Sequence, residues 1–388
     1  MADERRPFSY SLHSLLPVLL LISVTIRPTP YRRLLFLPIF VIAYYLVYHT
    51  TTGDIISNLS IGASIPPLVA SALDYIFLTE PQTELFQRGQ TIPHAAFPDL
   101  KSRLKWSLSL LTSQRGIGWT HEPRNLPPSP YTASTSRWRF VVDRLAQSAM
   151  LFIFWDAAAT YTRYRPSFYI SGPEETTFLG RCAFVWGWAV PAVAALTMNH
   201  ALFSAAMVAL GIWDVQTWRP FYGSWSDAYT VRRFWSHTWH QLLRRNVTTP
   251  GDRLVARLSL PKGSILASYI RLYIAFFVSG WVHHSSDYMV LGYHGGALKF
   301  FMSQALCITV ESAVLALGRH LGIARGTNLF WQHRRVYLGS SVVCYVPAHV
   351  HQPAKSSGGI RGWCELGNYR RALEMVDYHP TIDILDPE

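Results

Sequence analysis

The stretch Ile274-Ala-Phe-Phe-Val-Ser-Gly-Trp-Val-His-His-Ser-Ser-Asp287 ends an apolar run with two adjacent histidines and an aspartate. Ionisable side chains at membrane depth are costly, so by default they indicate a functional site. If the stretch is helical throughout, His283 and Asp287 share a face, where the carboxylate would orient the imidazole and fix its tautomer. The alternative is a hydrated pair, His283 and His284, at a helix end in the headgroup layer. The stretch by itself does not decide between a general base and that idle pair.

Composition assigns the chain to the membrane class. Of its 388 residues 49% are hydrophobic and 15% are charged, whereas a soluble domain carries about 25% charge. Long apolar runs alternate with stretches rich in arginine and proline, which predicts an all-α, polytopic integral membrane protein in contact with the bilayer. The net charge of +12 fits positive-inside loops, anionic headgroups or a phosphate-rich ligand. Nucleic acid is the least favoured partner, because the basic residues form no continuous stripe.

The apolar runs predict about eight or nine transmembrane helices within a single membrane domain over 1–388. Pro66-Pro67 should kink or break the third span. The region 178–213 is too long for one crossing at about 1.5 Å per residue, and Pro191 and Asn199-His200 within it suggest a broken helix or a hairpin. The other expected spans are 12–26, 34–48, 55–78, 140–159, 265–282, 297–317 and 336–350.

Basic residues concentrate in 27–33, 79–139, 214–262 and 319–335. All four segments can face the cytosol if 178–213 makes an odd number of crossings. We therefore expect 79–139 and 214–262 to be cytosolic loops, with the N-terminus and the polar C-terminal tail 351–388 in the lumen. In this arrangement the glycosylation sequon at Asn58 lies near the lumen, whereas the sequon at Asn246 is cytosolic and should stay unmodified.

A second candidate region is Val231-Arg-Arg-Phe-Trp-Ser-His-Thr-Trp-His-Gln-Leu-Leu-Arg-Arg245. As a helix it would be amphipathic, which is typical of a helix lying on the membrane surface. Alternatively, its arginines bind the phosphates of a soluble donor while His240 or Gln241 faces an enclosed site, because the planar guanidinium binds phosphate in a bidentate manner.

The segment Phe234-Trp-Ser-His-Thr-Trp-His-Gln-Leu-Leu-Arg244, followed about forty residues later by Ser279-Gly-Trp-Val-His283, resembles the paired signature of the wax synthase branch of the membrane-bound O-acyltransferases. Arg115-Gly-Ile-Gly-Trp119 is similar to a further short motif of that branch. The resemblance covers about residues 100 to 350. Fungal members that this chain resembles include acetyltransferases that decorate terpenoid and meroterpenoid secondary metabolites.

The resemblance implies that the transmembrane helices enclose a catalytic chamber, and it implies residue roles. His283 would be the catalytic histidine, and His240 would occupy a position where many relatives carry asparagine, which leaves its role as base, orienter or structural residue open. Plant members often carry Glu at the position of His284, so Asp287 becomes the candidate carboxylate partner. The residues expected to bind acyl-CoA are Arg232, Arg233, Trp235, Trp239, Gln241 and Arg244.

The implied reaction is acyl transfer from acetyl-CoA or another acyl-CoA to the hydroxyl of a hydrophobic alcohol. The thioester is already activated, so the enzyme needs to deprotonate the hydroxyl and to hold both substrates. The reaction requires no covalent intermediate, and we expect no bound cofactor and no metal. The expected location is the endoplasmic reticulum membrane. The sequence determines neither the acceptor nor the oligomeric state.

Three other functions remain as alternatives: a long-chain wax-ester synthase, a His-ligated di-iron oxidoreductase and a transporter. The histidines form no HxxxH or HxxHH box, which disfavours the iron site. Glu311 and Arg271 fall inside apolar runs and receive no role; each could snorkel, pair with the other or line a tunnel.

Overall fold

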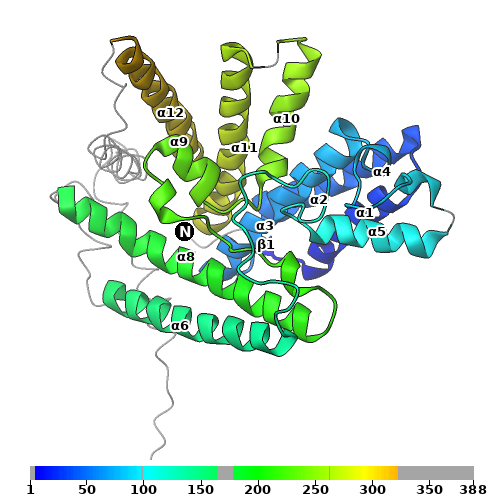
Figure 1. Cartoon of the computed structure of the whole chain (residues 1–388), viewed down its shortest axis with the longest axis horizontal. Helices are drawn as coiled ribbons and strands as arrows, with labels where there is room; N and C mark the ends of the chain where they lie inside the picture. The colour runs from blue at the N-terminus through cyan, green and yellow to red at the C-terminus, as the bar shows by residue number, and fades with distance from the viewer. Residues whose placement is uncertain (1–4, 98, 164–177, 262, 322–388) are drawn as a thin grey trace, which may run out of the picture. The chain divides into compact units, whose positions relative to one another are not determined.

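The computed structural model describes residues 5–97, 99–163, 178–261 and 263–321 (Figure 1). The expected span 336–350 and the tail 351–388 lie outside the described residues. The longer helices are α1 (Tyr10–Thr25), α2 (Phe36–His49), α3 (Ile55–Leu73), α5 (Leu100–Thr112), α6 (Arg137–Arg163), α8 (Phe178–Ala209), α10 (Arg244–Arg257), α11 (Ile265–Leu291) and α12 (Ala297–His320). The short helices are α4 (Pro81–Glu84) and α9 (Val231–Arg233), with 3₁₀ turns at Pro30–Leu35, His94–Ala96, Val215–Thr217 and Trp225–Asp227 and π turns at Asp74–Leu78 and Phe234–Thr238.

The prediction of an all-α membrane protein is confirmed. The strands in the described ranges are β1 (Arg6–Pro7) and β2 (Thr50–Thr51), which form one short parallel pair. Five helical segments in the described part of the chain are long and apolar enough to cross a membrane, and α1 is apolar but shorter. Those five segments are Pro30–His49, Ser57–Leu78, Ala189–Ala209, Ile265–Leu291 and Ala297–His320. The expected span 140–159 is helical, as part of α6, but is not among them.

The predicted break in 178–213 is wrong, and of the kink or break predicted at Pro66-Pro67 the break is wrong. The helix α8 is continuous for 32 residues through Pro191 and Asn199-His200, and α3 is continuous through Pro66-Pro67. A proline removes one backbone hydrogen bond, whereas a full break in an apolar medium would leave several polar groups without partners, so the unbroken helix is favoured. The placement of 79–139 and 214–262 on the same side of the membrane requires a crossing by 140–159 in addition to the one by α8, and it stays a prediction.

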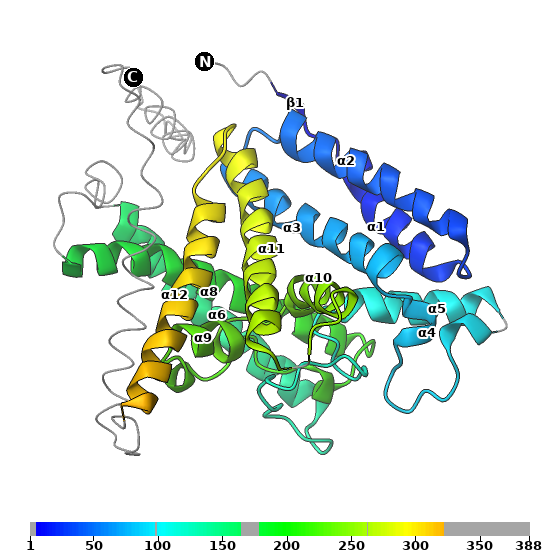
Figure 2. The ribbon, with the colours of Figure 1, turned by 90° about the horizontal axis from the view of Figure 1, so that it is seen from above.

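Three helices, α3, α10 and α12, pack against α11 (Figure 2). A glycine lies at each of these contacts, and a Cβ atom added to it would collide with the neighbouring helix. Gly62 of α3 faces the backbone of Ser286, Gly251 of α10 faces Arg271, and Gly280 of α11 itself faces α12. Small residues allow helix backbones in membranes to approach closely. The sequence of α11 and its neighbours thus makes the helix with the two histidines the centre of this part of the fold.

Polar contacts tie the helices together at both ends. At one end, Arg5 donates to the carbonyl oxygens of Tyr288 (3.2 Å) and Met289 (3.1 Å) in the last turns of α11. At the other end, Arg245 forms an ion pair of 2.6 Å with the buried Asp74. Arg32, which follows α1, likewise pairs with Glu80 near the end of α3. Basic residues from distant parts of the sequence therefore lie at the end of α3 that is opposite to Arg5.

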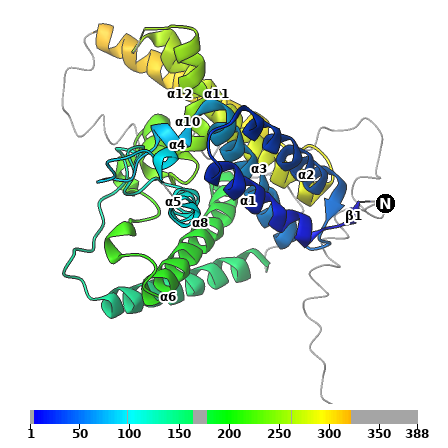
Figure 3. The same cartoon turned by 90° about the vertical axis from the view of Figure 1, so that its right-hand side faces the viewer.

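The helices α6 and α8 form a separate antiparallel pair (Figure 3). Phe140 and Val141 of α6 pack against Ala205 and Val208 of α8, and Trp218 covers this cluster. The pair thereby fixes the start of the segment that leads toward α9.

Candidate functional site

His283 lies inside α11 and not at its end. The helix continues to Leu291 and ends at Gly292, which has a φ of 75° in the left-handed region. The imidazole stacks on Phe301 of α12, with ring centroids 4.7 Å apart and an interplanar angle of 14°. The side chain is surrounded by protein atoms yet keeps an exposed surface. An imidazole that is surrounded by protein atoms and still accessible suits a group that has to contact a substrate.

The segment 231–245 does not form the predicted amphipathic helix. Helix α9 lasts three residues, a π turn follows at Phe234–Thr238, and Trp239 has an extended backbone with a ψ of 148°. The amide of Gln241 donates to the carbonyl oxygens of Trp239 (2.8 Å) and Trp235 (3.4 Å), so it closes the turn. Regular helix resumes at Arg244. The break changes the direction of the chain around His240 and carries this residue into the interior.

His240 is enclosed by aromatic rings. The ring centroids of Trp239, Phe221 and Tyr222 lie 5.3, 5.7 and 6.2 Å from its own. Its Nδ1 atom is buried without a hydrogen-bond partner in the described part of the chain. Burial, helped by the charges of His283 and Arg115, lowers the pKa of His240 to about 4. His240 is therefore neutral at pH 7. A series of ring contacts through Phe301, Trp235 and Trp239 connects His283 to His240.

Arg115 holds the loop that covers His240. Its buried guanidinium donates to the carbonyl oxygens of Pro220 (2.7 Å) and Arg219 (2.9 Å) and to Nε2 of His200 (3.3 Å). Burial lowers the pKa of Arg115 to about 10, which leaves it charged at neutral pH. The segment 115–119 therefore has a structural role beside the site.

One face of α12 completes the surroundings of His283. Phe301, Gln304 and Ile308 on this face are buried. Trp235 donates its indole N–H to Oε1 of Gln304 (3.3 Å), while the amide nitrogen of Gln304 is buried without a partner among the described residues. Gln304 and Tyr222 are not among the site residues expected from the sequence. The position of an uncharged amide inside an apolar run could have indicated Gln304 as a site residue, whereas no sequence pattern distinguishes Tyr222.

Asp287 has a different partner from the one expected. Its Oδ2 atom accepts from the backbone N–H of Ala297 (3.0 Å) at the start of α12. No hydrogen bond joins Asp287 to His283 in the described ranges. A side chain at Gly295 would collide with the carboxylate, so Asp287 fixes the turn between α11 and α12. His284 interacts with His294, with Nε2 and Nδ1 2.9 Å apart.

The arginines proposed to bind the donor differ in their partners. Arg232 donates to Ser312 (3.1 Å), and Arg233 pairs with Asp227 (3.2 Å). Arg244 is half-buried and makes no side-chain hydrogen bond or ion pair within the described residues. Its guanidinium is thus the most available of the three for an anionic ligand.

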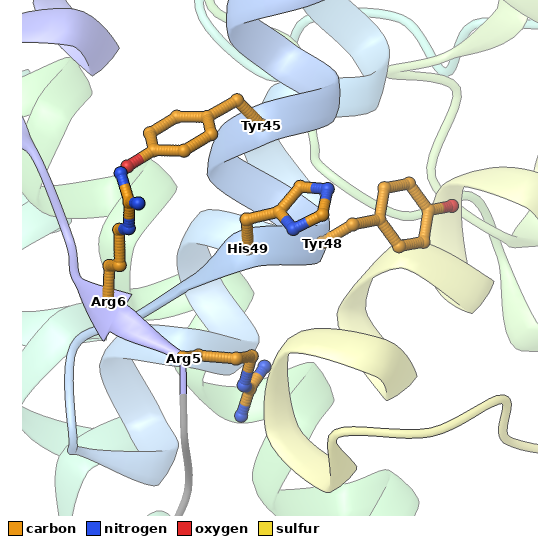
Figure 4. A pocket seen from close by; sticks show the side chains of 5 residues that line it. All are labelled: Arg5, Arg6, Tyr45, Tyr48 and His49. Carbon is orange, nitrogen blue, oxygen red and sulfur yellow. The ribbon is translucent and has the colours of Figure 1, made fainter.

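A pocket of about 450 Å³ lies away from these residues. Figure 4 shows its lining by Arg5, Arg6, Tyr45, Tyr48 and His49, which come from the N-terminal segment and from α2. Neither His240 nor His283 lines it. Across the described ranges, no group of three or more His, Cys, Asp or Glu side chains is placed to hold a metal ion.

Comparison with known proteins relates the chain to one protein family. Residues 218–303 match the model of the membrane bound O-acyl transferase family. The chain is 36% identical to acetyltransferase ple2 of Rhodocybe pseudopiperita, over 82% of this chain and 84% of that protein. It is 32% identical to acetyltransferase eriL of Hericium erinaceus, over 81% and 84% of the two chains.

A further relative has a different activity in its name. O-Mevalon transferase yanI of Aspergillus niger is 31% identical over 64% of this chain and 62% of that protein. No solved structure matches the chain. The matched residues 218–303 include His240 and His283, and the likeness to ple2 and eriL extends over most of the sequence. The chain therefore belongs to the membrane bound O-acyl transferase family and is an acyltransferase.

Proposed function

We propose that the protein transfers an acetyl group from acetyl-CoA to a hydroxyl of a hydrophobic acceptor of the terpenoid or meroterpenoid class, in the endoplasmic reticulum membrane. The observation that carries this proposal is the series of aromatic ring contacts, through Phe301, Trp235 and Trp239, that connects the imidazole of His283 to that of His240. An imidazole with an exposed surface inside the membrane helices, beside a second, neutral imidazole, is suited to remove a proton from an alcohol where water is scarce.

In the proposed mechanism, His283 removes the proton from the acceptor hydroxyl. The alkoxide oxygen attacks the thioester carbonyl carbon, the new C–O bond forms, and the C–S bond breaks. The CoA thiolate leaves and takes up the proton from the imidazolium, so that the products are the ester and CoA. The enzyme carries no covalent acyl group at any stage. His240 remains neutral and orients the reacting groups, because its lowered pKa keeps a second positive charge away from His283.

For the donor, we assign the main phosphate contact to Arg244. Burial lowers the pKa of this guanidinium. Its charge has no ion-pair partner in the described part of the chain. A phosphate group would supply that partner in bidentate geometry. Arg232 and Arg233 would contribute from the rim, where their present partners are a hydroxyl and the carboxylate of Asp227.

The names of the relatives support acetyl as the transferred group. The relatives ple2 and eriL, which are 36% and 32% identical to this chain, are named acetyltransferases, whereas two O-mevalon transferases match it at 31% and 28% identity. The alternative within the family is a wax-ester synthase that uses long-chain acyl-CoA and a long-chain alcohol.

The test is an incubation of microsomes that contain the protein with labelled acetyl-CoA or palmitoyl-CoA, against a panel of terpenoid and long-chain alcohols. We expect labelled ester from acetyl-CoA and terpenoid alcohols, and none from His283→Ala at equal protein level. Ester formed only from palmitoyl-CoA and long-chain alcohols would favour the wax-ester synthase. Absence of ester with every pair, from well-folded protein, would reject the proposal. Fluorescent tagging with an endoplasmic reticulum marker tests the location.

A further inference from the structure

Glu311 receives a clear position in the structure. It lies on α12, inside a segment long and apolar enough to span a membrane, and its carboxylate contacts the first residues of α9. Oε1 accepts from the backbone N–H of Val231 (3.1 Å) and Oε2 from the backbone N–H of Arg232 (3.2 Å). A carboxylate at this depth is expensive, and two backbone N–H groups at the start of a helix would otherwise lack partners. Each group therefore satisfies the other across two distant parts of the sequence.

The segment that Glu311 holds cannot maintain its own shape. It consists of a three-residue helix, a five-residue π turn and an extended Trp239, and helices this short are unstable without external contacts. Its position must therefore come from the surfaces on which it packs. The N-terminal anchor of the segment is Glu311, and His240 lies at its other end.

Glu311 belongs to the face of α12 that surrounds the site. Phe301, Gln304, Ile308 and Glu311 follow one another at helical spacing and so share one side of the helix. Phe301 stacks on His283, and Gln304 accepts from Trp235 in the middle of the held segment. A single rigid helix thus contacts the catalytic histidine at one level and the segment that carries His240 at two others.

We infer that Glu311 is a positioning residue for the acyl transfer: its carboxylate fixes the segment 231–241 on α12 so that His240 is held beside His283. This inference rests on the proposed function of the site. Glu311 does not touch the substrates in this account and acts through the backbone of Val231 and Arg232. Losing the carboxylate releases the start of the segment and increases the range of positions that His240 samples. Small displacements of a catalytic group can reduce a rate by about 100-fold.

The test compares Glu311→Ala and Glu311→Gln with the matched control Ser312→Ala, in full-length protein purified in detergent and selected for normal size-exclusion behaviour. Ser312 is the next residue, and its side-chain hydrogen bonds among the described residues join it to the side chain of Arg232 and to the carbonyl oxygen of Ile308 in its own helix. Two quantities are measured: hydrogen exchange of the backbone amides in 228–241, and kcat and KM for labelled ester formation.

We expect Glu311→Ala to raise exchange in 228–241 and to lower kcat at least about tenfold with KM changed less than about threefold, because position and not binding is lost. Glu311→Gln keeps one acceptor oxygen and should lie between Glu311→Ala and the wild type in both measurements. Ser312→Ala should stay within about twofold of the wild type. Unchanged exchange in Glu311→Ala would overturn the inference, and so would raised exchange with a normal kcat. The exchange measurement does not depend on turnover, so a wild type that forms no ester refutes the proposed function without deciding the contact of Glu311.

Discussion

At the scale of single residues, the site depends on which polar groups have partners. Asp287, Arg233 and Gln241 are engaged by hydrogen bonds or ion pairs with neighbouring groups. His283 keeps an exposed surface, and His240 keeps a nitrogen without a partner in the described ranges. Buried polar groups are normally hydrogen-bonded, and exceptions call for an explanation. Substrate binding next to the two histidines supplies one.

The two adjacent histidines should differ in their effect on activity. We expect His283→Ala to lower kcat by at least about 100-fold, the usual contribution of a general base. His284→Ala should retain most of the activity, because His284 interacts with His294 and not with the residues around His240. Ester formation per mole of protein is the measurement. Equal losses in the two variants would show that the assignment of the base is wrong.

The role of Asp287 separates a structural contact from a chemical one. We expect Asp287→Asn to retain most of the kcat, since the amide oxygen can still accept from the N–H of Ala297. Asp287→Ala removes the acceptor and should lower the free energy of unfolding by about 1 kcal/mol, which is measured as a lower melting temperature. A hundredfold lower kcat in Asp287→Asn, with a normal melting temperature, would instead favour the carboxylate as the orienter of His283.

Thermal stability should depend on pH through His121. Burial and the nearby charge of Arg245 lower the pKa of this histidine from 6.5 to about 4. Between these two values the unfolded chain binds a proton at this site and the folded chain does not, so stability falls as the pH is lowered from 6.5 toward 4. We expect His121→Gln to flatten this slope in melting curves recorded at pH 4.5 to 7. The slope should not vanish, because His240 contributes in the same direction. An unchanged slope would exclude a contribution from His121.

At the scale of elements, helix α11 is the structure on which the site is built. It contacts α3, α10 and α12 through positions where a glycine allows backbones to approach. One of these glycines, Gly280, belongs to the Ser-Gly-Trp-Val-His segment. Part of that signature therefore reflects packing against α12 and not chemistry. The segment 231–241 is then held on this assembly by side chains of α12.

A substitution at the crossing of α3 and α11 tests this packing. Gly62→Val places a side chain against the backbone of Ser286 and should destabilise the protein by about 1 to 3 kcal/mol, the usual cost of overpacking. Gly318→Val is the control, because Gly318 in α12 has no atom near the position of an added Cβ. Melting temperatures in detergent are compared. Equal melting temperatures for the two variants would show that α3 and α11 do not need this close approach.

At the scale of the whole chain, basic residues of 27–33 and 214–262 lie at one end of the helices around α11, where Arg245 pairs with Asp74 and Arg32 with Glu80. The positive-inside rule predicts that this end faces the cytosol. Acyl-CoA is a soluble, anionic donor, so we expect it to enter from this side, while an apolar acceptor can enter from the bilayer.

Glycosylation provides a test of this orientation. The side-chain amide of Asn246 donates to the carbonyl oxygen of Pro67 (2.9 Å) and to Ser71 (3.0 Å), and its segment lies at the basic end. We expect no glycan on Asn246 when the protein is expressed in microsomes, and an engineered sequon near the N-terminus serves as the lumenal control. A shift in mass after expression that disappears in Asn246→Gln would place this loop in the lumen and reverse the topology.

The all-α membrane class, most of the helices and the two histidines of the signature could be predicted from the sequence. These features depend on local composition, on apolar run length and on a short signature, all of which are visible in one chain. The break expected in 178–213 was wrong, because a helix among apolar groups loses one backbone hydrogen bond at Pro191 but keeps the bonds on either side.

The assembly of the site depends instead on contacts between segments that are far apart in the chain. The segment 231–245 has the pattern of an amphipathic helix. Contacts with α12 and the hydrogen bond from the Gln241 amide to the carbonyl oxygen of Trp239 instead stabilise an extended backbone at Trp239. In the same way, the carboxylate of Asp287 accepts a hydrogen bond from the N–H of Ala297 and not from His283. The carboxylate of Glu311 accepts from two backbone N–H groups that lie about 80 residues earlier in the sequence. Such choices depend on which donors and acceptors meet once the helices have packed, and no periodicity within a segment records them.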